Sequence, residues 1–284
     1  MIILGEDLVT VKISKMTEEN EETSQARKRI LTTIGNKKCP WGCIYCFVDS
    51  ENYPGLNRID RPDAENVYHL TDKSVDIIQP AADVEITLVP DYTDLLNKLA
   101  DFGKHISFST KSRIRNLKLD ELRIIHEKLS AKGAILQIAV SILKLNDWHE
   151  IEQRTPSPFE RIETLKLLYE TGIATSVAFR PLLPFITRGE IEEIVELTHR
   201  YTYAYLTGPV YLTPALIKYM TEKGHKYILD KKQVNWIPNN PIMDVVQSPE
   251  LEKILIDCAE KYKVPVFKSN IDLVAALAQK FVNP

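Results

Sequence analysis

Three of the chain's four cysteines lie within eight residues of one another, in the segment KKCPWGCIYCFVDS (37–50). They occupy positions Cys39, Cys43 and Cys46, with spacers of three and two residues. Thiolates at such spacing can bind a metal ion or an iron–sulfur cluster, form disulfides or take part in redox chemistry. These cysteines are therefore the first candidate for a functional site.

A structural zinc site usually takes four ligands, and no clear fourth ligand accompanies these cysteines. Cys258 lies alone on an apolar helical pattern, which predicts a small buried side chain. His69 could complete a site with three cysteines. Zinc deaminases carry an H-x-E motif before P-C-x-x-C, and this chain has no H-x-E. Zinc therefore fits the pattern poorly.

Three thiolates without a fourth suit a [4Fe–4S] cluster that keeps one iron open for another ligand. In a tight loop, the spacers of three and two residues let three sulfurs reach three corners of a cube. The remaining open iron would bind a small molecule. A plain electron-carrying cluster is the alternative reading of the same residues.

Composition is that of a globular chain of 284 residues, with 44% hydrophobic and 26% charged residues. The net charge of −3 gives no electrostatic signature of nucleic-acid binding, which argues against duplex DNA as a partner. No apolar run approaches the ~20 residues that span a membrane, and the start does not resemble a signal peptide. We expect a cytoplasmic protein without membrane contact, in which clustered cysteines bind metal rather than form disulfides.

From residue 83 onward, short apolar runs alternate with helical patterns. Strands are expected at 84–89, 105–110 and 134–142, with further ones after Gly172 and around 203–208. Capping boxes at Ser157 and Thr187 predict two helix starts. This order predicts an α/β fold with about six βα units, a partial (β/α)6 TIM-type barrel whose ligands gather at the strands' carboxyl ends.

We expect the core of this fold to span 35–225. An N-terminal extension is expected at 1–34, and a C-terminal extension packing on the core at 226–284. The polar stretch 48–82 is interpreted as an insertion after the first strand.

The cysteine spacing, with Tyr45 before the third cysteine, resembles the radical SAM superfamily. That resemblance implies a partial barrel, a [4Fe–4S] cluster on the three cysteines and S-adenosylmethionine (SAM) on the open iron. It also implies reductive cleavage of SAM to methionine and a 5′-deoxyadenosyl radical, which abstracts hydrogen from a substrate. Tyr45 would then lie beside the adenine.

Between about residues 35 and 210 the chain also resembles the spore photoproduct lyase-like group. The similar segments are STKS (109–112), VSI (140–142), EQRTPSPFERIETLKLLYETGI (152–173) and RPLLPFITRGEIEEI (180–194). The resemblance implies that Lys111 and Ser141 contact SAM. The group's lyase has a cysteine near the end of its second strand and a tyrosine after the third motif cysteine. Here EITLVPDYTD has no cysteine, and Phe47 replaces the tyrosine.

Three further residues are candidates for contact with SAM or a substrate. Arg180 ends an expected strand and could pair with an anionic substrate or with the carboxylate of SAM. Asp91 follows Pro90 and could hydrogen-bond a ligand or cap a helix. Tyr211 could flank the adenine or belong to the core.

The sequence thus predicts a radical SAM enzyme with an unidentified small-molecule, peptide or nucleotide-derived substrate. A reductase such as flavodoxin or ferredoxin would supply the electron. DNA lesion repair of the spore photoproduct lyase type and a non-enzymatic iron–sulfur electron carrier are the alternatives. The residue that quenches the radical cannot be identified from these motifs.

Overall fold

The computed structural model describes residues 9–11, 28–34, 39–59, 75–237 and 239–282. Eight parallel strands form its main sheet, in the order β12-β8-β7-β6-β5-β4-β2-β3. Six of them are neighbours in the sheet in the order in which they occur in the sequence: β2 (Lys28–Ile34), β4 (Val75–Gln79), β5 (His105–Thr110), β6 (Leu136–Ser141), β7 (Ala174–Phe179) and β8 (Tyr205–Thr207). The edge strands are β12 (Val266–Phe267) and β3 (Asn57–Ile59).

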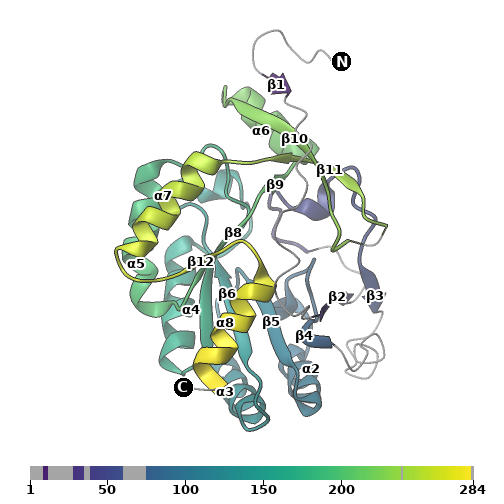
Figure 1. Ribbon diagram of the computed structural model, residues 1–284, viewed down its shortest axis with the longest axis vertical. Coiled ribbons are helices and arrows are strands. Elements are labelled where there is room, and N and C mark those ends of the chain that lie inside the picture. Colours follow the sequence, from purple (N-terminus) through teal and green to yellow (C-terminus); the bar gives the residue numbers. More distant parts are fainter. Residues whose placement is uncertain (1–8, 12–27, 35–38, 60–74, 238, 283–284) are drawn as a thin grey trace.

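Helices join successive strands and lie on the outer side of the curved sheet (Figure 1). They are α2 (Tyr92–Leu99), α3 (Leu117–Ser130), α4 (Pro158–Glu170) and α5 (Arg188–Thr198). Parallel strands joined by crossover helices curl into a barrel-like sheet. The predicted α/β partial barrel is confirmed.

Local sequence signals explain where two of these helices begin. The Ser157 side chain accepts a hydrogen bond from the Glu160 backbone N–H, and Glu160 returns one to the Ser157 backbone. Thr187 and Glu190 form the same reciprocal pair at the start of α5. Both predicted capping boxes are confirmed, and each satisfies two otherwise unpaired N–H groups.

The second strand of the barrel is not where the sequence placed it. Residues 84–89, expected to be a strand, contain a short 3₁₀ helix, Ile86–Leu88. The strand in that place is β4, inside the stretch 48–82 that was interpreted as an insertion. The Glu85 side chain accepts a hydrogen bond from the Thr87 backbone N–H and so favours a turn over an extended strand.

Segments late in the chain complete the architecture. A second sheet has the order β1-β10-β11-β9, formed by β1 (Val9–Val11), β10 (Tyr227–Gln233), β11 (Ile242–Val246) and β9 (Val210–Tyr211). The remaining helices are α6 (Pro214–Glu222), α7 (Pro249–Glu260) and α8 (Asn270–Val282). Among the residues described here, no helix has the length and apolarity needed to cross a membrane.

The two faces of the main sheet carry different side chains. On β5, Ile106 and Phe108 belong to the large hydrophobic core with the outer helices. The intervening Ser107 and Ser109 line a cavity on the other face. Since side chains alternate along a strand, this pattern places an apolar face against the helices and a polar face toward the barrel interior.

Helix α8 packs against the interior of the barrel. Its Leu273, Val274 and Leu277 form a separate hydrophobic cluster with Ile77 and Leu206, which come from β4 and β8. Figure 1 shows α8 lying across the strands. The first residue of α8, Asn270, therefore faces the cavity that the next section describes.

Candidate active site

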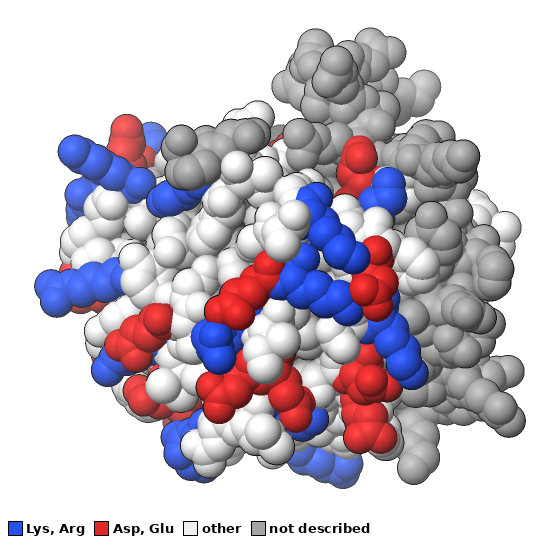
Figure 2. All heavy atoms as spheres, turned by 90° about the horizontal axis from the view of Figure 1, so that it is seen from below, with Lys and Arg blue, Asp and Glu red and all other residues white. Residues whose placement is uncertain are grey.

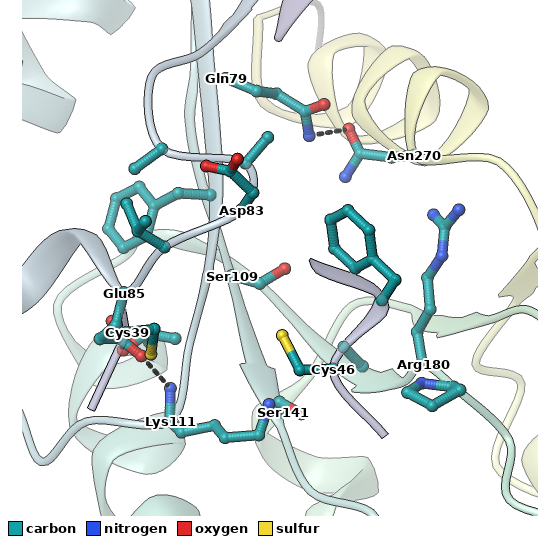
Figure 3. Close-up of a pocket in the computed structure, with 18 of the residues that line it drawn as sticks. Cys39, Cys46, Gln79, Asp83, Glu85, Ser109, Lys111, Ser141, Arg180 and Asn270 are labelled. Atoms are coloured by element: carbon teal, nitrogen blue, oxygen red, sulfur yellow. Dashed lines mark hydrogen bonds between the residues drawn. The ribbon is translucent and has the colours of Figure 1, made fainter. Parts of the chain in front are cut away.

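A cavity of about 260 Å³ lies at the carboxyl ends of the strands and inside the curve of the sheet. All three clustered cysteines line it, although each belongs to the loop after β2 and not to a strand. Cys39 and Cys46 both point into it in Figure 3. Ligand sites of parallel α/β sheets are expected at this end of the strands.

Burial changes the acidity of two of these thiols. It raises the pKa of Cys43, and it raises the pKa of Cys46 to about 11. Both thiols therefore carry protons near neutral pH when no metal is bound. Metal or cluster binding would release these protons, because the thiolate is the ligand form.

The donors of the cavity fit a [4Fe–4S] cluster and SAM. In the described part of the chain, no three His, Cys, Asp or Glu side chains converge on one ion. A four-iron cluster, however, bonds each thiolate through a different iron. Two buried cavity atoms, Ser141 Oγ and Asp83 Oδ1, have no hydrogen-bond partner among the described residues. Polar groups of a bound ligand would satisfy both atoms.

Lys111 lies next to the loop after β2 that carries Cys39, Cys43 and Cys46, called the cysteine loop below. Its Nζ is 5.6 Å from the centre of the Tyr45 ring. Burial alone lowers the pKa of Lys111, but the Coulombic attraction of Cys43, once its thiol is ionised, and of the Glu152 carboxylate outweighs it, so that the pKa lies above its usual value. Lys111 is therefore a cation held on the cysteine side of the cavity, where it can pair with a ligand carboxylate.

Tyr45 is 4% exposed and lines the same cavity. Its hydroxyl donates a hydrogen bond to Glu152 Oε1. Tyr45 and Ser141 thus line the same cavity as Lys111 and the three cysteines. Their contact with SAM remains a prediction.

A buried ion pair, Glu152 with Arg161, supports the cysteine loop through hydrogen bonds. Glu152 and Arg161 are 1% and 0% exposed, and Arg161 Nη2 donates to Glu152 Oε2. The second guanidinium arm, Nη1, donates to the Ser141 carbonyl oxygen over 2.8 Å. Through these hydrogen bonds, the Glu152–Arg161 pair connects the Tyr45 hydroxyl to the end of β6. It lies in the segment EQRTPSPFER, whose resemblance was noted but whose role was not predicted.

Backbone contacts reinforce this connection. Cys43 forms an antiparallel bridge with Glu152, and the Ile44 N–H donates to the Ile151 carbonyl oxygen at 3.0 Å. On the other side, Thr213 Oγ1 donates to the Ile44 carbonyl oxygen. The cysteine loop is therefore fixed from two directions by segments more than 100 residues away in sequence.

Glu85 is a further site residue that the sequence did not reveal, because it fell within an expected strand. Its carboxylate accepts hydrogen bonds from Trp41 Nε1 (3.1 Å), Thr110 Oγ1 (2.8 Å) and the Lys111 backbone N–H (2.8 Å). It connects the cysteine loop to the end of β5, and Figure 3 shows its bond to Lys111. Glu85 thus positions Lys111 relative to the cysteines.

The three further candidates, Arg180, Tyr211 and Asp91, have different positions. Arg180 and Tyr211 line the cavity. Asp91 does not: it is exposed at the N-cap position of α2, with a φ of 53° and no side-chain capping bond. Cys258 is buried on α7 within the hydrophobic core, as predicted. His69 lies outside the described residues.

An aromatic wall, Phe47, Tyr211 and Trp236, closes the cavity beside Cys46. The Phe47 ring centre is 5.5 Å from that of Trp236 and 6.4 Å from that of Tyr211. Phe47 follows the third cysteine directly, and the other two come from the second sheet and the loop after β10. The sequence did not reveal Trp236 as a site residue, because the aromatic side chains that it contacts, Phe47 and Tyr211, are distant from it in sequence.

Comparisons with known proteins agree with this geometry. The model of the Radical SAM superfamily matches residues 34–198, more than half of the chain. No curated protein gave a significant match.

Solved structures with the same fold include SuiB of Streptococcus suis bound to S-adenosylmethionine. It is 12% identical with a TM-score of 0.54, and the match covers 86% of this chain and 51% of SuiB. The chain thus spans about half the length of SuiB.

A spore photoproduct lyase mutant with dinucleoside spore photoproduct is 15% identical with a TM-score of 0.61. That match covers 92% of this chain and 82% of the lyase. At such identities these likenesses concern the fold. The match over residues 34–198 includes all three clustered cysteines, and the chain belongs to the radical SAM superfamily.

Proposed function

We propose that this chain is a radical SAM enzyme that acts on a small organic substrate. Cys39, Cys43 and Cys46 would hold a [4Fe–4S] cluster, and Lys111, Ser141 and Tyr45 would contact SAM. The observation that carries the proposal is that all six residues line one cavity inside a partial barrel. When bound, the cluster and SAM supply reductive cleavage of SAM and a 5′-deoxyadenosyl radical that abstracts hydrogen.

The chain's own residues orient the reactants. Lys111 would pair with the carboxylate of SAM, and the buried Ser141 hydroxyl would donate to or accept from one of its polar groups. Phe47, Tyr211 and Trp236 would keep bulk water from the reacting atoms. An external reductase such as flavodoxin or ferredoxin would deliver one electron in the cytoplasm, where thiols stay reduced.

Surface charge supports a substrate other than duplex DNA. Figure 2 shows Lys and Arg side chains intermixed with Asp and Glu on the face below α2 and α3. Ion pairs such as Lys98–Asp94 on α2 and Arg123–Glu127 on α3 lie on these helices. Binding to a DNA backbone favours a concentrated basic surface. Repair of a DNA lesion, as in the lyase, is therefore the less favoured function.

The test is anaerobic reconstitution with iron and sulfide, followed by addition of dithionite and SAM. We expect 5′-deoxyadenosine, and an EPR signal of the reduced cluster that changes when SAM is added. Alanine at any one of the three clustered cysteines should abolish both, whereas Cys258→Ala should leave both intact. A fully loaded cluster that yields no 5′-deoxyadenosine, with an EPR signal insensitive to SAM, would support an electron carrier instead.

A further inference from the structure

Arg180 is a cation in the cavity that no acidic side chain balances. It follows β7 directly, and its guanidinium points toward Asn270 and away from Lys111 (Figure 3). Within the described parts of the chain, no carboxylate lies within ion-pair distance of Arg180. Burial lowers the pKa of Arg180, with only the Tyr211 hydroxyl acting in the opposite sense. Arg180 is half-buried, and a cation withdrawn from water without a counter-charge is costly, which favours a function for it.

The chain makes room for this side chain. A Cβ atom at Gly208 would lie 3.0 Å from Arg180 Nε and 3.4 Å from its Cδ. The Gly208 carbonyl accepts a hydrogen bond of 3.0 Å from the Leu182 N–H, which fixes the glycine beside the arginine. Glycine at this position therefore allows the arginine stem to lie against the end of β8 and extend into the cavity.

The cavity surface next to Arg180 is formed by the side-chain amides of Gln79 and Asn270, called the amide floor below, and it is polar but uncharged. Gln79 Nε2 donates to Asn270 Oδ1 at 2.8 Å, and Asn270 Nδ2 donates to Ser107 Oγ at 3.3 Å. Ser107 also donates to Gln137 Oε1 at 2.6 Å. This network satisfies its own members and contains no carboxylate, so it neither neutralises Arg180 nor repels an anion beside it.

We propose that Arg180 binds an oxyanion, a carboxylate or phosphate, of a small substrate that lies on the amide floor formed by Gln79 and Asn270. A guanidinium is suited to this role because two parallel N–H groups match two oxygens of either anion. The cavity that Arg180 lines has a volume of about 260 Å³, which suits a small molecule better than a polymer. The assignment of this anion to the substrate rests on the proposed function.

SAM also carries a carboxylate, and the two cations of the cavity divide these roles by position. Lys111 lies beside Cys43 and the Tyr45 ring, where the methionine part of SAM would reach the open iron. Arg180 points in the opposite direction in Figure 3, toward α8. A ligand at Arg180 would therefore face SAM across the cavity and not share its carboxylate site.

The experiment uses the full chain, reconstituted with its cluster and saturated with SAM under anaerobic conditions. Inorganic phosphate and acetate are the probes, each titrated at constant ionic strength against chloride, with the thermal midpoint as the readout. We expect one or both probes to raise the midpoint of the wild type. Arg180→Gln should weaken that binding at least tenfold, and Arg180→Lys should restore part of it. Arg188→Gln is the control, because Arg188 is exposed and paired with Glu192.

The binding of SAM, measured by the EPR change, separates the two carboxylate sites. Arg180→Gln should change the affinity for SAM less than twofold, and a tenfold loss would overturn the proposal. Binding of neither probe, or equal binding to wild type and Arg180→Gln, would also overturn it. If Arg180→Gln does not fold, Gly208→Ala tests the same contact, since the added Cβ displaces the guanidinium. Loss of SAM cleavage with intact probe binding would refute only the proposed function.

Discussion

The buried pair of Glu152 and Arg161 gives the sharpest prediction about stability. Both side chains are essentially without solvent contact, so Arg161→Met leaves the Glu152 carboxylate buried without its counter-charge. Breaking a buried ion pair in this way typically costs about 3–5 kcal/mol. The substitution also removes the hydrogen bond from Arg161 to the Ser141 carbonyl oxygen.

That cost can be expressed as a thermal shift. At about 2.1 cal/mol/K per residue, the entropy of unfolding of this chain is about 0.6 kcal/mol/K, so Arg161→Met should lower the midpoint by about 5–8 °C. The double variant Glu152→Gln/Arg161→Met removes both charges and keeps an acceptor for the Tyr45 hydroxyl. It should recover about 3–5 °C and melt about 2–3 °C below the wild type, since the remaining loss is mainly one hydrogen bond of about 1–2 kcal/mol.

Differential scanning calorimetry of the anaerobically prepared protein measures these shifts. Arg188→Met is the matched control, because its pair with Glu192 is exposed to solvent and should contribute little to stability. The reasoning fails if Arg161→Met shifts the midpoint no more than Arg188→Met. It also fails if the double variant melts no higher than Arg161→Met, because the buried unpaired charge would then not be the cause.

Three further predictions concern the cavity and the core. Lys111→Met should weaken SAM binding, measured by equilibrium dialysis, about 10- to 100-fold, because a hydrogen bond to a charged group is lost. Its iron content should not change. The surface variant Lys98→Met is the control and should bind SAM as the wild type does. Cys39→Ala should lose the cluster and Cys258→Ala should keep it, as colorimetric iron and sulfide assays would show; equal iron in both would contradict the assigned ligands. Burial lowers the pKa of His126 in the folded protein below its usual 6.5. As the pH falls, the imidazole of the unfolded chain is therefore protonated before that of the folded protein. The free energy of unfolding should decrease as the pH drops below about 6.5. His126→Leu should reduce the loss of unfolding free energy between pH 7.5 and pH 5.5, as measured by urea unfolding. If this loss is unchanged in the variant, His126 is not its source.

Local patterns were enough to predict much of the fold. The capping boxes at Ser157 and Thr187 and the apolar strand segments from 105 onward depend on neighbours within a few residues, and they were confirmed. β4 was missed because it has only five residues and follows a long polar stretch. The segment 84–89 has β-branched residues, but the Glu85 carboxylate ties it into a turn.

Within the site, the sequence revealed residues with a recognisable spacing and missed those that act through distant contacts. The three cysteines stand in one short segment, so their common cavity could be predicted. The Tyr45–Glu152 bond joins residues 107 positions apart, and the Gln79–Asn270 bond joins residues 191 positions apart. A single sequence does not show which distant polar residues meet, because that depends on the register and curvature of the whole sheet.

The position of α8 has a consequence for how the protein is made. Ribosomes deliver the cysteine loop early, but Asn270 and the apolar side chains that close the barrel interior come more than 200 residues later. Until α8 docks, the polar interior of the nascent barrel stays open to the solvent, and so do the cysteines that line it. The lining of the cavity is therefore complete only after the last helix has docked, so an incomplete chain would present its cysteines in an unfinished site.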